Sequence, residues 1–238
     1  MSNLSELKVG LTGRFPCSYL ENEEEQLIML MDPENNSQKN YAALIEIGFR
    51  RSGEQVYRPH CPTCEGCESL RINSERFVLS KSQKRLLNKN KHFTIVQSNK
   101  VKETYYPLYE RYINQIYRDG VMYPASLEQF ESFIRCSWVN IIFLEVYDGE
   151  KLISVSVTDQ LLSETAQSWS AFYCFYDPDY QAHSLGKYAV LQQLQLAKKY
   201  NINYLYLGYY IQNCQKMNYK NQFNPHQRFI KQQWIDFD

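Results

Sequence analysis

The hydrophobic pattern of the chain changes its period near residue 140. Upstream, apolar residues recur at helical spacing over 103–117 and again over 127–134, which predicts two amphipathic helices. Downstream, the pattern predicts in order a strand at 140–147, a turn at Asp148 and Gly149, strands at 151–158 and 167–176, a turn at 177–179, a helix over about 187–200 and a strand at 204–208. This succession of strand, turn, helix and strand predicts a βαβ crossover within an α+β fold.

The first 90 residues carry shorter elements. They predict a helix over 41–47 that ends at Gly48, strands at 49–57 and 69–72 that frame a cysteine-rich loop, and a basic helix over 81–91. At 238 residues the chain is long enough for two small domains. We therefore expect a smaller N-terminal α/β domain over 1–90, which carries the cysteine-rich loop, and a second domain over 91–238.

Three evenly spaced cysteines, Cys61, Cys64 and Cys67, define the loop between these strands. Thiols so close in sequence cannot all pair with one another. Together with the distant Cys17 they would supply four sulfur ligands, enough for tetrahedral zinc or an iron–sulfur centre. Two C-x-x-C steps that share a cysteine match neither a zinc ribbon nor a zinc finger. The alternatives are a tight loop of reduced thiols or a redox-active centre, because the cations beside the loop would favour a thiolate.

Basic residues are segregated, although the chain has 26 Lys and Arg against 26 Asp and Glu. With no net charge, any contact with a polyanion must come from local groups of cations. Two such groups are present: Lys81, Lys84, Arg85, Lys89, Lys91, Lys100 and Lys102, and then Lys216, Lys220, Arg228 and Lys231. They predict either nucleic-acid contacts or ordinary solvated faces.

Ser184 and Gly186 stand at the start of the helix predicted over 187–200. Backbone N–H groups at a helix N-terminus can bind an anion. Serine is also a common N-cap, so a helix cap without a ligand is the alternative.

Tyr209 and Tyr210 follow the strand at 204–208, and Lys216 and Lys220 lie one helical turn apart just beyond them. This segment predicts a pocket wall with a cationic rim, or else edge-strand tyrosines and solvated lysines. No grouping of Ser, His and Asp indicates covalent catalysis. Any acyl transfer would therefore depend on positioning an already activated donor.

The first ten residues are polar and do not resemble a signal peptide. No stretch approaches the roughly 20 apolar residues that a membrane span needs. Seven cysteines, an odd number, favour a reducing compartment over a disulfide framework. We expect a cytoplasmic protein with no membrane partner.

Eight short motifs occur in one order along nearly the whole chain: residues 17–20, 48–53, 57–61, 69–72, 175–179, 184–186, 206–209 and 216–220. In this order the chain resembles the aminoacyl-tRNA–protein transferases of the arginyltransferase family, in particular the short bacterial branch that transfers leucine. The resemblance implies an enzyme of the N-degron pathway, which moves leucine from leucyl-tRNA to the N-terminal Asp or Glu of a protein. It also implies an acetyltransferase-like (GNAT) fold for the C-terminal domain.

In arginyl relatives with an iron–sulfur centre, the pattern that the resemblance implies is a C-x-x-C motif near the N-terminus plus an adjacent cysteine pair. Here Leu20 and Gly66 stand at two of those four positions. We therefore expect that no cofactor is required. Zinc or an iron–sulfur cluster on Cys17, Cys61, Cys64 and Cys67 is the alternative.

The implied reaction assigns roles to the basic and aromatic residues. An acidic first residue needs cationic partners, and the guanidinium group grips a carboxylate through two parallel hydrogen bonds. The candidate substrate-binding residues are Arg50, Arg51, Arg58, His60, Arg71, Tyr209, Tyr210, Lys216 and Lys220. The candidate tRNA-binding residues are Lys84, Arg85, Lys89, Lys91, Ser184 and Gly186, and the catalytic base is not identified.

Two rival functions remain. The first is transfer of arginine, with the same chemistry and a different aminoacyl pocket. The second is a metal-bearing module that binds tRNA or protein without catalysis.

Overall fold

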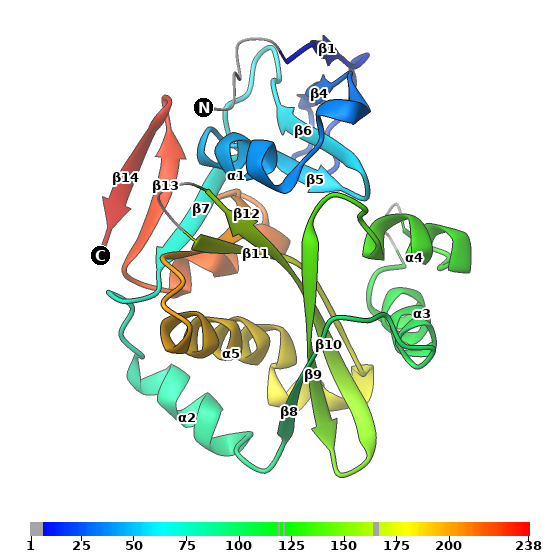
Figure 1. Ribbon diagram of the computed structural model, residues 1–238, viewed down its shortest axis with the longest axis vertical. Coiled ribbons are helices and arrows are strands. Elements are labelled where there is room, and N and C mark those ends of the chain that lie inside the picture. The colour runs from blue at the N-terminus through cyan, green and yellow to red at the C-terminus, as the bar shows by residue number, and fades with distance from the viewer. Residues whose placement is uncertain (1–6, 119, 121, 164–166) are drawn as a thin grey trace.

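A large mixed sheet crosses the molecule and takes strands from both halves of the chain (Figure 1). The computed structural model describes residues 7–118, 120, 122–163 and 167–238. Its strands are ordered β14-β13-β7-β12-β11-β10-β9-β8. Their bounds are β7 (Glu68–Asn73), β8 (Thr94–Ser98), β9 (Asn140–Asp148), β10 (Lys151–Leu162), β11 (Gln167–Tyr176), β12 (Tyr204–Tyr210), β13 (His226–Ile230) and β14 (Gln233–Phe237).

A smaller sheet, ordered β1-β4-β6-β5, comes from the N-terminal part alone. Its strands are β1 (Val9–Leu11), β4 (Leu27–Leu30), β5 (Arg50–Ser52) and β6 (Gln55–Pro59), and a separate ribbon joins β2 (Phe15–Pro16) to β3 (Glu24–Glu25). The large sheet takes β7 between β12 and β13, so the N-terminal part also supplies an inner strand there. The expected domain division at residue 90 stays a prediction.

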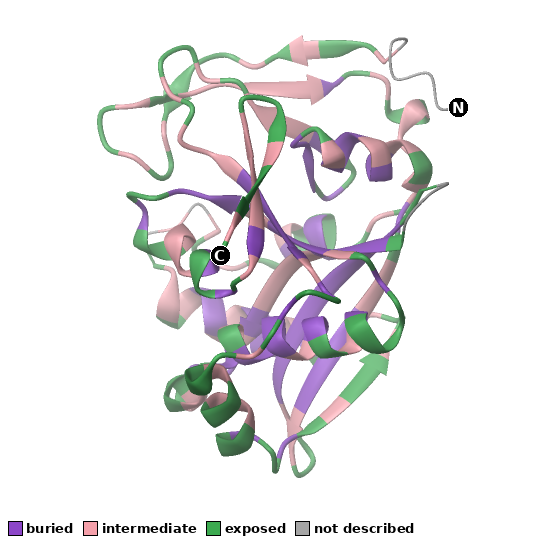
Figure 2. Cartoon of the chain, turned by 90° about the vertical axis from the view of Figure 1, so that its left-hand side faces the viewer, coloured by how far each residue is buried: buried purple, intermediate pink, exposed green. Residues whose placement is uncertain are grey.

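Helices cover both faces of the large sheet. One face carries α5, whose Val190, Leu191 and Leu194 pack against Leu70 and Leu205 of the sheet. The other face carries α3 and α4 at one end and α1 at the other. The helices are α1 (Gln38–Glu46), α2 (Lys81–Lys89), α3 (Tyr105–Ile116), α4 (Leu127–Ile134), α5 (Leu185–Lys199) and α6 (Gln215–Asn218), with 3-10 turns η2 (Pro33–Asn35), η3 (Pro178–His183) and η4 (Tyr219–Gln222). The buried residues concentrate in the central strands (Figure 2).

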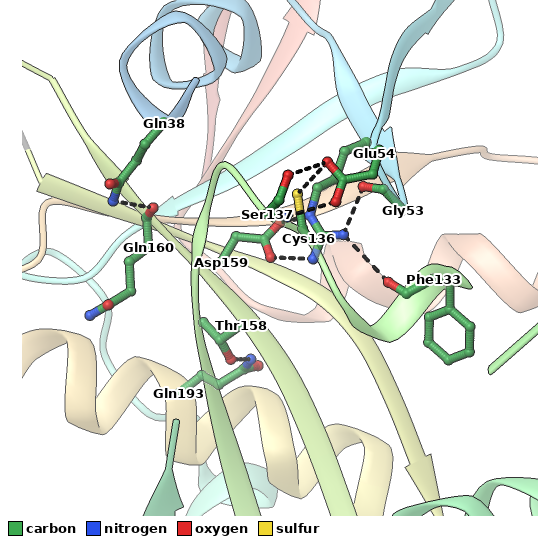
Figure 3. Close-up of polar contacts among 11 residues, drawn as sticks. Gln38, Gly53, Glu54, Phe133, Cys136, Ser137, Thr158, Asp159, Gln160 and Gln193 are labelled. Carbon is green, nitrogen blue, oxygen red and sulfur yellow. Dashed lines mark hydrogen bonds and ion pairs between the residues drawn. The ribbon is translucent and has the colours of Figure 1, made fainter. Parts of the chain in front are cut away.

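Alternate residues of strand β10 make contacts on opposite faces of the large sheet. Thr158 accepts a hydrogen bond from Gln193 of α5 at 2.7 Å, whereas its neighbour Asp159 faces the opposite side (Figure 3). There the Asp159 carboxylate forms an ion pair with Arg51 of β5. Arg51 Nε and Nη2 donate to the two carboxylate oxygens at 2.8 Å and 2.6 Å. Both side chains are fully buried. The small sheet is therefore fastened to the large one by a two-pronged ion pair.

The parallel strands β11 and β12 pair only at their beginnings, through Ser168–Ser170 and Tyr204–Tyr206. Beyond that point β11 stays with β10 and β12 stays with β7, so the two strands part. The βαβ crossover expected from the sequence is confirmed by this parallel pair and the α5 helix between its strands.

One local expectation was wrong, and one element was not predicted. Residues 49–57 were expected as one strand but form the β5–β6 hairpin, which turns at Gly53, where φ is +57°. The β13–β14 hairpin at the end of the chain was not expected at all. Among the described residues, none of the helices is long and apolar enough to span a bilayer.

Replacing Asp159 with Asn should lower the free energy of unfolding by about 3–5 kcal/mol, because the buried Arg51 charge loses its counter-ion. Urea denaturation followed by circular dichroism measures the change. The matched control is the double variant Arg51→Met/Asp159→Leu, which removes both charges and should regain most of the loss. An Asp159→Asn protein as stable as the parent would mean that the pair contributes little.

Candidate functional site

Two adjacent arginines of β5 have opposite surroundings. The Arg51 guanidinium is occupied by Asp159, by the carbonyl oxygen of Gly53 at 3.2 Å and by the Phe172 ring at 3.8 Å. Arg50 points the other way, over the rings of Tyr206 and Tyr209 at 5.5 and 5.4 Å. Because successive residues of a strand face opposite sides, the two guanidinium groups lie among different partners.

The Arg50 guanidinium is buried and only partly satisfied. Its Nη1 donates to the carbonyl oxygens of Phe49 at 2.6 Å and Ile45 at 3.5 Å. Its Nε and Nη2 are buried, and neither has a hydrogen-bond partner in the described part of the chain. These two atoms form the edge that Arg51 uses to hold Asp159. Since a buried, unpaired donor is costly, this free edge is suited to a carboxylate supplied from outside.

A bulge in β12 directs two tyrosines toward Arg50. The pairing with β7 skips a residue between Tyr206 and Gly208, where φ is +79°. Tyr206 and Tyr209 therefore share a face although they are three residues apart. Tyr210 lies on the other face, within the core under α5. Tyr209 and Tyr210, expected to line one pocket, are thus on opposite sides of the sheet.

Lys220 is the second buried basic residue of this cluster. Its Nζ donates to the carbonyl oxygen of Tyr209 and contacts Met217 Sδ at 3.5 Å. Burial, followed by the nearby charge of Arg50, lowers the pKa of Lys220 to about 7. Lys216, expected beside it on a cationic rim, is exposed, and its Nζ lies 5.5 Å from the Tyr117 ring. The two lysines therefore differ in environment: only Lys220 belongs to the buried cluster.

The cysteine-rich loop lies against the same cluster. The Cys67 side chain lies close enough to Tyr57, Tyr209 and Lys220 to affect the pKa of each. Burial raises the pKa of Cys67 to about 12 and also raises the pKa of Cys61. These two thiols are therefore protonated at neutral pH, and the expectation that cations beside the loop would favour a thiolate is wrong for them.

The four thiols expected as metal ligands lie in one region, since Cys17, Cys61 and Cys64 all act on the pKa of Cys67. All seven cysteines are free, and Cys17, Cys61, Cys64 and Cys67 each remain partly exposed. Over residues 7–118, 120, 122–163 and 167–238, no three His, Cys, Asp or Glu side chains lie close enough together to hold a metal ion. As arranged, this donor set does not fit a tetrahedral metal site.

The remaining arginines and His60 have other surroundings. Arg71 is held by Glu46, by Gln227 at 2.7 Å, and between the Tyr204 and Trp234 rings at 4.0 Å each. Arg58 is half-buried, and its Nη1 donates to the Ile47 carbonyl oxygen at 3.0 Å. His60 is exposed. Like Arg51, Arg71 is committed to other protein groups, whereas Arg58 and His60 lie near the surface.

The candidate tRNA-binding residues do come together. Lys89 at the end of α2 donates to the Ala182 carbonyl oxygen at 2.7 Å, and Asn90 donates to that of His183 at 2.9 Å. These bonds pin α2, with Lys84, Arg85 and the following Lys91, to the turn before α5. Ser184 there has φ +48°, and its hydroxyl does not cap α5. The exposed cations of α2 and the N-terminus of α5, including Gly186, thus form one surface, here called the α2–α5 surface.

Some residues of this site were not among those predicted from the sequence. Tyr57 pairs in register with Arg50 and lies 6.4 Å from the Tyr209 ring, and Tyr206 lies under the Arg50 guanidinium. A glycine inside a strand pattern often marks a bulge, so Gly208 was the signal for the shared face of Tyr206 and Tyr209. Asn90, which joins α2 to the turn before α5, gave no such signal.

The chain is similar to known proteins over most of its length. Residues 15–85 and 104–230 match the models described as "Arginine-tRNA-protein transferase, N terminus" and "Arginine-tRNA-protein transferase, C terminus". A solved structure of L-PGS from Bacillus licheniformis is 11% identical, with a TM-score of 0.42, over 72% of this chain and 50% of that one.

Three relatives named aspartate/glutamate leucyltransferase align with almost the whole chain. The Aeromonas hydrophila protein is 48% identical over 98% of this chain and 96% of its own length. The Pseudoalteromonas atlantica protein is 46% identical over 96% of each, and a Vibrio cholerae protein is 44% identical over 98% of each. The chain therefore belongs to the arginine-tRNA-protein transferase family.

Proposed function

We propose that this protein transfers leucine from leucyl-tRNA to the N-terminal Asp or Glu of other proteins, as an enzyme of the N-degron pathway in the cytoplasm. The family membership supports an aminoacyl-tRNA–protein transferase. The names of relatives at 44–48% identity support leucine as the transferred residue and Asp or Glu as its acceptor.

The observation that carries this proposal is the free edge of Arg50. A buried guanidinium with Nε and Nη2 unpaired offers a carboxylate two parallel, charge-assisted hydrogen bonds. The adjacent Arg51 holds Asp159 through the same two atoms, within the same fold. The side chain of an acidic first residue would bind Arg50 in this geometry. Asn or Gln would leave one donor without an acceptor.

The chemistry needs little from the enzyme beyond positioning. The aminoacyl ester of charged tRNA is already activated, so its carbonyl carbon needs only a neutral amine held in line. No covalent enzyme intermediate is required. Tyr57, Tyr206 and Tyr209 would support Arg50 around the bound carboxylate, and Arg58 and His60 would contact the substrate nearer the surface.

The α2–α5 surface is suited to the tRNA. Lys84, Arg85, Lys89 and Lys91 present cations to phosphates, and the uncapped N-terminus of α5 beside Ser184 and Gly186 presents backbone N–H groups. The parting of β11 from β12 just before α5 supports an acetyltransferase-like arrangement, in which the tRNA 3′ end would occupy the gap between the strands.

No cofactor is needed for this reaction. No step of the proposed reaction is assigned to a metal on Cys17, Cys61, Cys64 and Cys67, no three of which lie close enough together to hold one as placed. The cysteine-rich loop would instead shape the wall of the site, since Cys67 lies beside Tyr209 and Lys220. No membrane partner is expected.

An assay with two charged tRNAs tests the proposed function. Purified protein is given leucyl-tRNA and arginyl-tRNA, each with a peptide that begins with Asp. We expect leucyl-peptide as the main product, and little product from a matched peptide that begins with Asn. Preferential transfer of arginine would replace leucine as the donor group, and tight tRNA binding without any product would support a non-catalytic module.

Replacing Arg50 with Met should lower kcat/KM for the Asp peptide by about 10- to 150-fold, which corresponds to the 1.5–3 kcal/mol of a charged hydrogen-bonded contact. The variant should melt no lower than the parent, because it removes a buried and incompletely paired charge. Steady-state kinetics and a thermal melt measure both effects. Arg58→Met, which removes a less buried guanidinium, is the matched control and should lose less activity. An Arg50→Met protein that transfers leucine at the parent rate would exclude Arg50 from recognition.

Replacing both Lys84 and Arg85 with Gln should weaken tRNA binding at low salt and reduce the slope of log K against log salt by about 1.4–1.8, if each cation neutralises one phosphate. Filter binding over a salt series measures the slope. Lys198 and Lys199, exposed at the far end of α5, provide the matched control pair, whose replacement should leave the slope unchanged. Equal changes in slope for the two pairs would mean that the tRNA does not bind at the α2–α5 surface.

A further inference from the structure

Lys220 has the contacts of a neutral amine. Its side chain is buried, and within the described residues its hydrogen bonds go to the Tyr209 carbonyl oxygen and the Met217 thioether. Two N–H bonds satisfy these two weak or neutral acceptors. A neutral amine then keeps one lone pair, whereas an ammonium group would carry a third N–H bond.

The groups around Lys220 also favour the neutral form. Arg50 of β5 places a positive charge near it, which disfavours a second cation. The Tyr219 ring, 5.9 Å from Nζ, acts the other way, because an aromatic face weakly stabilises a cation. The Cys214 and Cys67 side chains also lie near it, and their effect on its pKa is smaller than that of burial and of Arg50. Among the described residues, no carboxylate forms an ion pair with Lys220. The net effect is to lower the pKa of Lys220 to about 7, so that the neutral amine is accessible near neutral pH.

Lys220 and Arg50 approach the same residue from two sides. The Arg50 guanidinium lies 5.4 Å from the Tyr209 ring, and the Lys220 amine binds the backbone carbonyl oxygen of Tyr209. The Gly208 backbone lies next to the amine, since a Cβ atom at that position would be 3.9 Å from Nζ. In an N-terminal Asp, the α-nitrogen is close to the side-chain carboxylate. A carboxylate on Arg50 therefore brings the α-nitrogen toward Lys220.

We propose that Lys220 is the proton acceptor that makes the α-amine of the acidic first residue nucleophilic. This inference rests on the function proposed above and assigns the base that the sequence did not identify. The α-ammonium group gives one proton to Lys220 Nζ. The free amine then attacks the ester carbonyl carbon, the new amide bond forms, and the ester C–O bond to the terminal ribose breaks. The ribose oxygen leaves with a proton from the attacking nitrogen, and Lys220 later releases its proton to water.

The acidic side chain has a second role in this scheme. Its carboxylate offsets the positive charge of Arg50, which raises the affinity of Lys220 for a proton at the moment of binding. Binding of an acidic first residue thus makes Lys220 a stronger base. Selection of Asp and Glu over Asn and Gln should consequently be seen in kcat as well as in KM.

The test compares Lys220→Met and Lys220→Arg with the parent enzyme, using leucyl-tRNA and two peptides. One peptide begins with Asp. The other carries an aminooxy group in place of the α-amine and is already neutral at pH 7. Loss of a general base should lower kcat for the Asp peptide by about 100- to 10,000-fold in both variants and remove the limb of the pH profile near 7. The aminooxy peptide should lose much less.

Two measurements separate catalysis from structure. The thermal midpoint and the tRNA affinity of both variants should match the parent within error. Equal losses for the two peptides, or a pH limb near 7 that survives in Lys220→Met, would overturn the assignment while leaving leucine transfer intact. A parent enzyme that makes no leucyl-peptide would instead refute the proposed function. The two failures are therefore distinguishable.

Discussion

The buried ion pair between Arg51 and Asp159 sets the position of the candidate site. It fastens the β5–β6 hairpin to the large sheet through two hydrogen bonds between fully buried groups. Once Arg51 is held on one side of β5, the alternation of a strand turns Arg50 to the other side, against β12. The charge of Arg51 is thus paired within the fold. Arg50 has two N–H donors without a partner in the described part of the chain.

The cluster around Arg50 joins segments that lie far apart in the sequence. β5 supplies Arg50, β12 supplies Tyr206 and Tyr209, and η4 supplies Lys220. The bulge before Gly208 puts the two tyrosines on one face, and the cysteine-rich loop lies over the same region. Among the described residues, neither the Arg50 guanidinium nor the Lys220 amine is paired with a carboxylate, and such burial of basic groups is unfavourable for stability. Their presence together is consistent with a site that awaits an anionic substrate.

Regular elements with a strong local period were predicted well. The hairpin of β9 and β10, the strands β11 and β12, and the helix α5 follow the pattern of apolar residues closely. The β13–β14 hairpin was missed because its strands mix polar and apolar residues, and its pairing with β7 is long-range. Residues 49–57 were predicted as one strand, because a single glycine among polar residues does not by itself reveal a tight turn.

The sequence by itself determined the α+β layout, the crossover and, through eight ordered motifs, the family. It also identified a set of arginines, lysines and tyrosines from which the site is drawn. Only the tertiary structure distinguished Arg50 from Arg51 and Arg71, Lys220 from Lys216, and Tyr209 from Tyr210. The physical reason is that burial, hydrogen-bond satisfaction and the face of a strand depend on partners brought together by folding, and residue type and spacing do not specify those partners.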